Sequence, residues 1–284
     1  MEPSQQTQPT LLYEVRDHVA TITLNRPEAL NAFNDDLLGN WELALDRAQR
    51  DQDVRVVLVT GTGRAFCVGG DVRAMGEKRS EDSTPITRRN HLKETVHRVA
   101  LAAAALDKPY IAAVNGPAVG AGMDMASMAD IRIASNNARF AMSYVKVGII
   151  PGDGGCYYLP RIVGMAKALD LIWSGRFMSA DEALAAGYVS RVVPADDLMQ
   201  ETLALAREYA KGPAVAIQLA KSLAYRSADT TLEAGLHLAQ LAMTIAQTTE
   251  DAREGPRAFL EKREPNFTAE WIDLQYDRFD PDYR

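Results

Sequence analysis

The sequence predicts an α/β fold that is followed by a helical appendage. Two apolar runs, residues 56–60 and 110–114, each lead into a glycine-rich loop and then into a helical pattern, as buried strands of an α/β domain do. From Ala180 onward the composition changes to alanine-rich helices. A chain of 284 residues with 47% hydrophobic content can bury one full-sized core. We therefore expect a single domain with a helical tail.

The elements that precede the first glycine-rich loop follow from alternation and spacing. Residues 12–16 and 19–24 predict a hairpin around Asp17-His18, and its second strand ends at the turn signal Asn25-Arg26-Pro27. A helix is expected to begin at Asn34 or Asp35. Its buried stripe is formed by apolar residues at helical spacing, namely Leu38, Trp41, Leu45 and Ala48.

The later elements are predicted in the same way. Residues 88–106 predict one amphipathic helix, and residues 131–134 and 139–141 predict two short strands. The appendage carries helical patterns over residues 180–186, 198–211, 214–225, 232–247 and 251–262. The closing run, residues 265–284, is rich in aromatic residues, so we expect it to dock on the body of the protein or on a partner subunit.

Charge and cysteine usage exclude several function classes. The net charge is −7 and no stretch concentrates Lys and Arg with aromatic residues, so a nucleic-acid partner is not expected. Arg88, Arg89 and Lys93 are interpreted as the solvated face of a helix. Cys67 and Cys156 lack ligand spacing and the four histidines are scattered, so neither a disulfide framework nor a metal site is predicted.

The N-terminal segment, the length of the apolar runs and the cysteine usage predict the cellular location of the protein. Residues 1–10 are polar and lack the basic and apolar regions of a secretory signal, which predicts a disordered lead. No apolar run is long enough to span a bilayer without interruption by polar residues. We expect a soluble protein in the reducing cytoplasm, with no membrane partner.

The two glycine-rich loops are the most informative feature of the chain. The first spans residues 64–72 and the second spans residues 115–124, and each opens a helix. Such loops present unpaired backbone N–H groups, and two converging donors form an oxyanion hole that stabilises charge on a carbonyl oxygen. Small residues let a ligand carbonyl approach this backbone closely, and they stand at Gly70, Gly120, Ala121 and Gly122.

The order of these motifs resembles the crotonase, or enoyl-CoA hydratase/isomerase, superfamily. The resemblance runs from about residue 12 to about residue 194, and it includes the segments 25–32, 150–155 and 159–164 as well as both loops. It implies a crotonase-type spiral of repeated ββα units, an acyl-CoA thioester as substrate, no permanently bound cofactor, and a homotrimer or homohexamer. The chain then divides into a disordered lead (1–10), a spiral core with the acyl-CoA site (11–195) and a C-terminal helical oligomerisation region (196–284).

The resemblance also implies roles for residues of the loops. The amides of Gly70 and Ala121 would form the oxyanion hole. Asp71 would fix the first loop by accepting hydrogen bonds from backbone amides, while Val68 and Arg73 would flank the nucleotide and pantetheine path. The complete set expected to contact the CoA thioester is Glu28, Ala29, Val68, Gly70, Asp71, Val72, Arg73 and Ala121.

Turnover also needs a group that carries protons, and Asp124 is the first candidate. It follows the second loop at the start of a helix, where the helix dipole favours an ionised carboxylate and hence a base. The resemblance places a glutamate here in hydratases, so an aspartate keeps the charge with a shorter reach. The alternative is a first-turn aspartate that only stabilises its helix.

Tyr144 and Asp153 are the other two candidates. Tyr144 stands where the resemblance implies a second glutamate, and a phenol with a pKa near 10 is a poor base at neutral pH, so ordinary two-glutamate hydration is not expected. Tyr144 alternatively lines the acyl pocket. Asp153 could replace the missing acid, or it could be the N-cap of the helix that follows.

We interpret the chain as an enzyme that stabilises a thioester enolate at Gly70 and Ala121 and then hydrates or shifts a double bond of an enoyl-CoA. Asp124, Asp153 and Tyr144 are the predicted catalytic residues. The loss of the second glutamate favours isomerisation over hydration. Hydrolysis of a carbon–carbon or thioester bond, and binding of acyl-CoA without turnover, remain alternatives.

Overall fold

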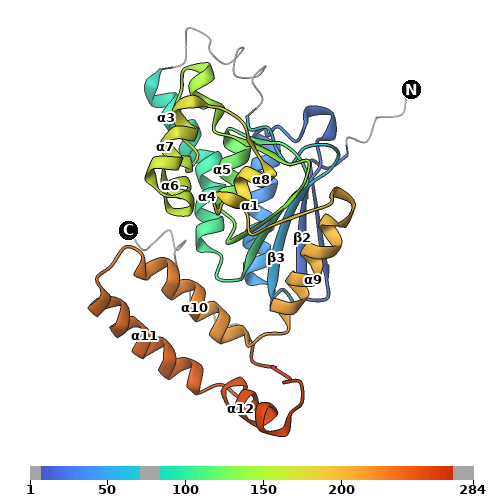
Figure 1. Cartoon of the computed structure of the whole chain (residues 1–284), viewed down its shortest axis with the longest axis vertical. Helices are drawn as coiled ribbons and strands as arrows, with labels where there is room; N and C mark the ends of the chain where they lie inside the picture. Colours follow the sequence, from blue (N-terminus) through green and yellow to red (C-terminus); the bar gives the residue numbers. More distant parts are fainter. Residues whose placement is uncertain (1–7, 71–83, 271–284) are drawn as a thin grey trace.

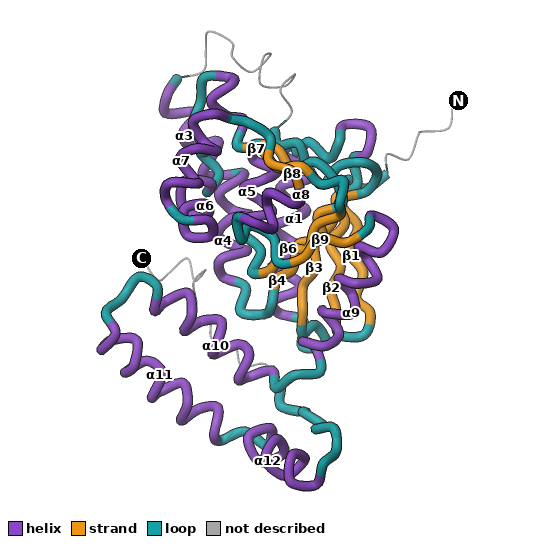
Figure 2. Tube along the Cα trace, viewed as in Figure 1, coloured by secondary structure: helices purple, strands orange, loops and turns teal. Residues whose placement is uncertain are grey.

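A twisted six-stranded sheet forms the centre of the protein (Figures 1 and 2). The computed structural model describes residues 8–70 and 84–270. The strand order is β1-β2-β3-β4-β6-β9, in which β1 and β2 form an antiparallel hairpin and the later neighbours pair in parallel. The strands span β1 Leu11–Arg16, β2 Val19–Leu24, β3 Val56–Gly61, β4 Tyr110–Val114, β6 Ile131–Ser135 and β9 Arg191–Val193. The predicted hairpin and strands are therefore present, and β9 is an additional strand that the sequence analysis did not identify.

A second, smaller sheet stands next to the loops of interest. Its order is β5-β7-β8, with β5 Ala118–Val119, β7 Arg139–Ala141 and β8 Met178–Ser179. β5 lies inside the second glycine-rich loop and pairs in parallel with β7. This pairing fixes one side of that loop at the edge of a sheet.

The large sheet is buried on both faces. Val57 and Val59 of β3 belong to one apolar cluster, whereas Val56 and Leu58 belong to a second cluster on the opposite face. This alternation explains why β3 is a continuous apolar run, since each face of a covered sheet needs apolar side chains. Helix α1 (Asp35–Arg50) contributes the fully buried Trp41 to the first cluster, and α9 (Leu198–Ala210) covers the second face.

The helix predicted over residues 88–106 is two helices. α3 (Pro85–Glu94) has no buried residue, whereas α4 (Val96–Ala105) buries Val96, Val99 and Ala103. The helical conformation is interrupted at Thr95, where φ is −122° and ψ is −93°. The Thr95 hydroxyl donates to the His91 carbonyl at 2.6 Å, which offers the backbone an alternative to continued helix.

The remaining helices lie close to the predicted positions, except α7, which the sequence analysis did not identify. α5 spans Ala121–Ser127, α6 Gly155–Val163, α7 Met165–Ser174 and α8 Ala180–Ala185. Three short 3-10 helices are η1 Pro27–Ala29, η2 Ser143–Val147 and η3 Ala195–Asp197. The C-terminal helices are α10 Ala214–Ser227, α11 Leu232–Gln247 and α12 Asp251–Glu261. Within the described ranges, no helix has the length and hydropathy needed to cross a bilayer.

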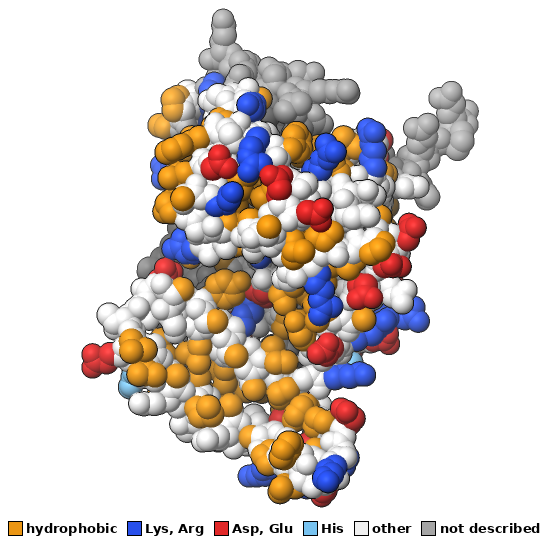
Figure 3. Space-filling view, in the orientation of Figure 1, with side chains coloured by type: hydrophobic (Ala, Val, Ile, Leu, Met, Phe, Trp, Pro, Cys, Tyr) orange, Lys and Arg blue, Asp and Glu red, His pale blue; other side chains and the backbone are white. Residues whose placement is uncertain are grey.

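Helices α10, α11 and α12 form an arm that projects from the body (Figure 1). The arm is tied to the body at Asp130, whose carboxylate accepts a hydrogen bond from Tyr225 at 2.8 Å and pairs with Lys221 at 2.8 Å. Figure 3 shows apolar side chains spread over the arm. Large apolar side chains that are exposed there are Tyr225, Leu232, Leu236, Leu241, Met243, Ile245, Phe259 and Leu260.

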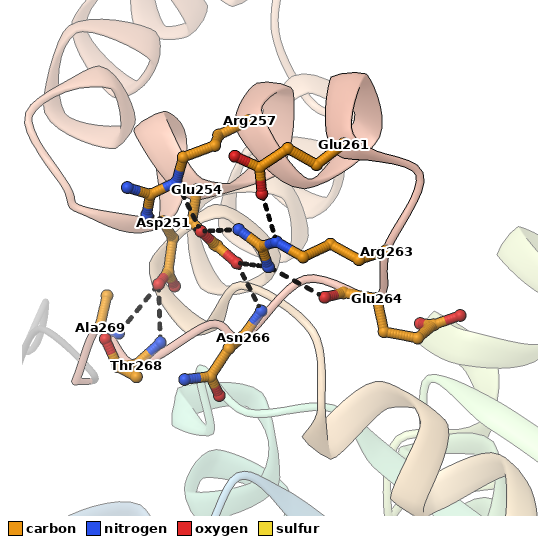
Figure 4. A network of polar contacts seen from close by, with 9 residues as sticks. All are labelled: Asp251, Glu254, Arg257, Glu261, Arg263, Glu264, Asn266, Thr268 and Ala269. Carbon is orange, nitrogen blue, oxygen red and sulfur yellow. Dashed lines mark hydrogen bonds and ion pairs between the residues drawn. The ribbon is translucent and has the colours of Figure 1, made fainter.

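A polar network closes the far end of the arm (Figure 4). The buried Glu254 carboxylate accepts hydrogen bonds from Arg257, Arg263 and the Asn266 amide. Asp251 accepts from the amides of Thr268 and Ala269 at 2.8 and 3.1 Å. These bonds fold the start of the closing run back onto α12, and the part of that run beyond residue 270 lies outside the described residues.

Candidate active site

The two glycine-rich loops lie against each other. Val119 donates to the Cys67 carbonyl at 3.0 Å and Cys67 donates to the Pro117 carbonyl at 3.2 Å, so the loops pair like short parallel strands. A Cβ on Gly122 would lie 2.0 Å from the Cys67 carbonyl oxygen. Glycine is thus required at this position because a side chain would force the loops apart.

This pairing brings together the ends of the loops that carry Gly70 and Ala121. A Cβ on Gly69, whose φ is +86°, would lie 3.2 Å from the Ala121 nitrogen. The Gly69 carbonyl is held by the Phe33 amide at 2.9 Å. Ala121 is the first residue of α5, and neither its amide nor that of Gly70 donates a hydrogen bond to any described residue. Within the described ranges, two N–H groups without a hydrogen-bond partner therefore stand on neighbouring loops.

Asn31 fixes the turn that precedes these loops. Its fully buried side chain donates to the carbonyls of Thr62 and Ala65 at 2.9 and 2.8 Å, and it accepts from the Arg26 amide at 2.9 Å. The 3-10 helix η1, which carries Glu28 and Ala29, is thereby held next to the first loop. Asn31 belongs to a segment that the sequence analysis quoted, but its positioning role depends on contacts about thirty residues away in the chain.

Asp124, Tyr144 and Asp153 form one buried cluster. The Tyr144 Oη lies 2.6 Å from Asp124 Oδ2 and 2.9 Å from Asp153 Oδ2. The exposed fractions are 0% for Asp124, 8% for Tyr144 and 7% for Asp153. α5, η2 and the turn before α6 supply one residue each, so three separate elements meet at a single phenol oxygen.

Burial controls the protonation of this cluster. It raises the pKa of Asp124 to about 7, and the charge of Asp153 acts in the same direction, while the Tyr144 hydrogen bond lowers the pKa. Burial also raises the pKa of Asp153, against the Tyr144 hydrogen bond and the attraction of His97. Desolvation of the carboxylate therefore opposes the helix dipole, which was expected to favour the ionised form of Asp124. The pKa of Tyr144 is raised as well, so the phenol stays neutral.

Asp124 also contacts an element other than its own helix. Gly155, the first residue of α6, packs so closely that a Cβ there would lie 2.3 Å from Asp124 Oδ1. Among the described residues, this oxygen accepts no hydrogen bond of acceptable geometry. The backbone amides of Gly155 and Asp153 nevertheless interact with the Asp124 carboxylate and lower its pKa.

Asp153 is not an N-cap. The residue at the start of α6 is Gly154, with φ at +113°, and no side chain caps this helix. The Asp153 carboxyl is directed at Tyr144 instead. This outcome removes the structural alternative that the sequence left open for Asp153.

Comparison with known proteins places the chain in a family. The model of the enoyl-CoA hydratase/isomerase family matches residues 14–270. The chain belongs to the enoyl-CoA hydratase/isomerase family. It is 39% identical over 262 residues to a probable enoyl-CoA hydratase of Mycobacterium tuberculosis, covering 92% of this chain and 99% of the relative. It is 38% identical over 260 residues to 1,2-epoxyphenylacetyl-CoA isomerase of Escherichia coli, covering 91% and 98%.

Solved structures agree with this assignment. The crystal structure of an enoyl-CoA hydratase from Mycobacterium smegmatis matches with a TM-score of 0.85 and 35% identity, over 92% of this chain and 99% of that one. The predicted crotonase fold and the predicted class of enzyme, an enoyl-CoA hydratase/isomerase acting on acyl-CoA, are confirmed. Because the relatives include both hydratases and isomerases, family membership leaves the reaction open.

Some of the other predicted site residues lie within the described residues and some do not. Val68 is half-buried in the first loop and Glu28 is exposed on η1. Asp71, Val72 and Arg73 lie outside the described residues. Cys67 is buried, which raises its thiol pKa to about 12 and makes it unreactive, whereas Cys156 is exposed. No cluster of His, Cys, Asp and Glu in the described ranges could hold a metal ion.

Proposed function

We propose that this enzyme moves the double bond of an enoyl-CoA by removing a proton from one carbon of the acyl chain and returning it to another. The thioester oxygen would accept hydrogen bonds from the Gly70 and Ala121 amides, whose N–H groups are free of other partners among the described residues. Each such donor contributes roughly 3 to 4 kcal/mol to stabilising the enolate oxygen.

The position of Tyr144 is the observation that carries this proposal. A phenol has one proton, so it can donate to only one of the two carboxyl oxygens that lie at 2.6 and 2.9 Å. The other contact needs a proton on the carboxyl itself. Two protons are therefore shared among Asp124, Tyr144 and Asp153, and the cluster carries one negative charge.

A cluster in this state can act as both base and acid. Its carboxylate would take a proton from the α-carbon of a β,γ-enoyl thioester, and the electron pair would move onto the thioester oxygen to give a dienolate. The cluster is then neutral while the dienolate carries the charge at the two amides. Return of a proton to the γ-carbon gives the α,β-enoyl thioester and restores the original charge of the cluster, so no water is consumed.

Hydration is less favoured because of the same geometry. A hydratase of the two-carboxylate type holds a water molecule between its acids, and here the phenol oxygen occupies the point where the two carboxyl oxygens converge. The proposed role of Tyr144 is therefore a neutral bridge that passes protons between Asp124 and Asp153.

The test is a product assay with purified enzyme, β,γ-enoyl-CoA and α,β-enoyl-CoA in separate reactions. We expect interconversion of the two isomers with little 3-hydroxyacyl-CoA. Tyr144→Phe should lower turnover by about 10²-fold, whereas Tyr157→Phe, which alters an exposed tyrosine of α6, should not. Rapid formation of 3-hydroxyacyl-CoA without any isomerisation would refute the proposal in favour of hydration, and free CoA as the main product would favour hydrolysis.

We also propose that the active form is a homotrimer or homohexamer assembled through the C-terminal helices. The support is the exposed apolar surface of the arm, which is large for a helical surface facing water (Figure 3). Light scattering of the intact chain should give a trimer or hexamer, and a stable monomer would contradict this proposal. The proposed contacts of the CoA thioester remain Glu28, Ala29, Val68, Gly70, Asp71, Val72, Arg73 and Ala121. No permanently bound cofactor is proposed, and a cytoplasmic location remains a prediction from cysteine usage.

A further inference from the structure

A histidine from a different element contacts the turn that carries Asp153. His97 lies on α4, half-buried, and its Nε2 is 2.9 Å from the Gly152 carbonyl oxygen. Because a carbonyl can only accept, Nε2 must carry a hydrogen and act as the donor. The contact joins positions 55 residues apart, at the residue immediately before Asp153.

This bond is well placed to control the catalytic turn. Gly152 and Gly154 flank Asp153, and a turn with glycine on both sides has little conformational preference of its own. The Tyr144 hydroxyl holds the Asp153 side chain, but among the described residues the Gly152 carbonyl is held by the His97 ring. Loss of that donor would free the backbone on which the carboxyl stands.

We propose that His97 is a positioning residue that holds the 152–153 turn through its Nε2–H and keeps the negative charge of the cluster on Asp153 rather than on Asp124. This inference rests on the proposed function, since it concerns which carboxyl acts as the base. In this arrangement the protonated Asp124 carboxyl would donate a hydrogen bond to the Tyr144 oxygen, and the Tyr144 hydroxyl would donate one to the Asp153 carboxylate.

The charges around the two carboxyls support this order. Asp153 faces Tyr144 from η2, Asp124 from α5 and His97 from α4, and the attraction of His97 lowers the Asp153 pKa. Asp124 faces Tyr144 and Asp153, with Cys156 of α6 and Tyr188 nearby, and the charge of Asp153 raises its pKa. An electrostatic difference therefore favours ionisation of Asp153 first.

Two substitutions of His97 separate the effect of its hydrogen-bond donor from the effect of its charge. His97→Gln keeps an N–H donor that can reach the Gly152 carbonyl but carries no positive charge, whereas His97→Leu removes both donor and charge. His91→Gln is the matched control, because His91 lies on α3 with 49% of its side chain exposed and contacts Asp35 rather than the site. All four proteins are assayed for kcat, KM and the pH dependence of kcat/KM with enoyl-CoA.

In His97→Gln we expect kcat within about threefold of wild type and an acidic limb of the pH profile moved to higher pH, since Asp153 loses an attractive charge. In His97→Leu we expect the same shift, with kcat at least tenfold lower and KM nearly unchanged. Unchanged kcat and pH profile in both variants would overturn the proposal, as would a loss confined to KM.

A second measurement distinguishes failure of this inference from failure of the proposed function. Infrared difference spectra recorded during a pH titration follow the protonated-carboxyl band, and Asp153→Asn and Asp124→Asn identify its two contributors. The inference predicts that the Asp153 band persists to higher pH in His97→Gln, even if wild-type protein turns over no enoyl-CoA. A band that titrates as in wild type would overturn it, whatever the reaction of the enzyme.

Discussion

Replacement of Asp124 by Asn should separate stability from activity. The Asp124 pKa is about 7 in the native protein and 3.8 ordinarily, because the carboxyl is buried. Between these pH values the native state holds a proton that the unfolded state has lost, so stability falls as pH rises. The slope is about 1.4 kcal/mol per pH unit, or about 4 kcal/mol over the whole window. Asn has no such proton and can still bond to Tyr144.

The assay is urea denaturation followed by tryptophan fluorescence at fixed protein concentration, from pH 5 to pH 8. The stability of Asp124→Asn relative to wild type should rise by about 3 kcal/mol across this range, most of it below pH 7. The variant should also bind acyl-CoA and show turnover lowered by about 10²-fold or more. Asp181→Asn, an exposed residue of α8, is the control and should show no such trend. A relative stability that stays constant with pH would refute the assignment of a raised pKa to Asp124.

Three further substitutions test other parts of the structure. Gly155→Ala should lower turnover at least tenfold, since its Cβ would lie 2.3 Å from Asp124 Oδ1; unchanged kinetics would contradict that contact. Glu254→Gln should lower the melting temperature above pH 5 and expose residues 263–270 to proteolysis, because hydrogen bonds from Arg263 hold the Glu254 pKa well below its usual range; an unaltered digestion pattern would count against the network. Lys108→Met should cost about 1 to 3 kcal/mol by leaving buried carbonyls at the end of α1 without a donor, as chemical denaturation can measure.

The glycine-rich loops could be located from the sequence because their structure is local. At the second loop, β4, the loop and the start of α5 follow one another within about fifteen residues, and glycine marks the positions where the backbone must approach a neighbour, as at Gly122. Helix α1 could also be predicted from the sequence, since Asn34 caps it and Trp41 lies on its apolar stripe. The interruption between α3 and α4 at Thr95 could not be predicted from the sequence, because the apolar spacing continues through it and only burial distinguishes the two helices.

The sequence by itself determined the N-terminal hairpin, the strands that lead into the two glycine-rich loops, the family resemblance and the residue types available at the site, since these depend on neighbouring positions in the chain. The tertiary structure decided how those residues act together. Asp124, Tyr144 and Asp153 come into hydrogen-bond contact only because α5, η2 and the turn before α6 converge in a buried place, and burial raises the Asp124 pKa against the effect of the helix start. The contact of His97 with Gly152 had no sequence signal, because a hydrogen bond between distant segments exists only once the chain has folded.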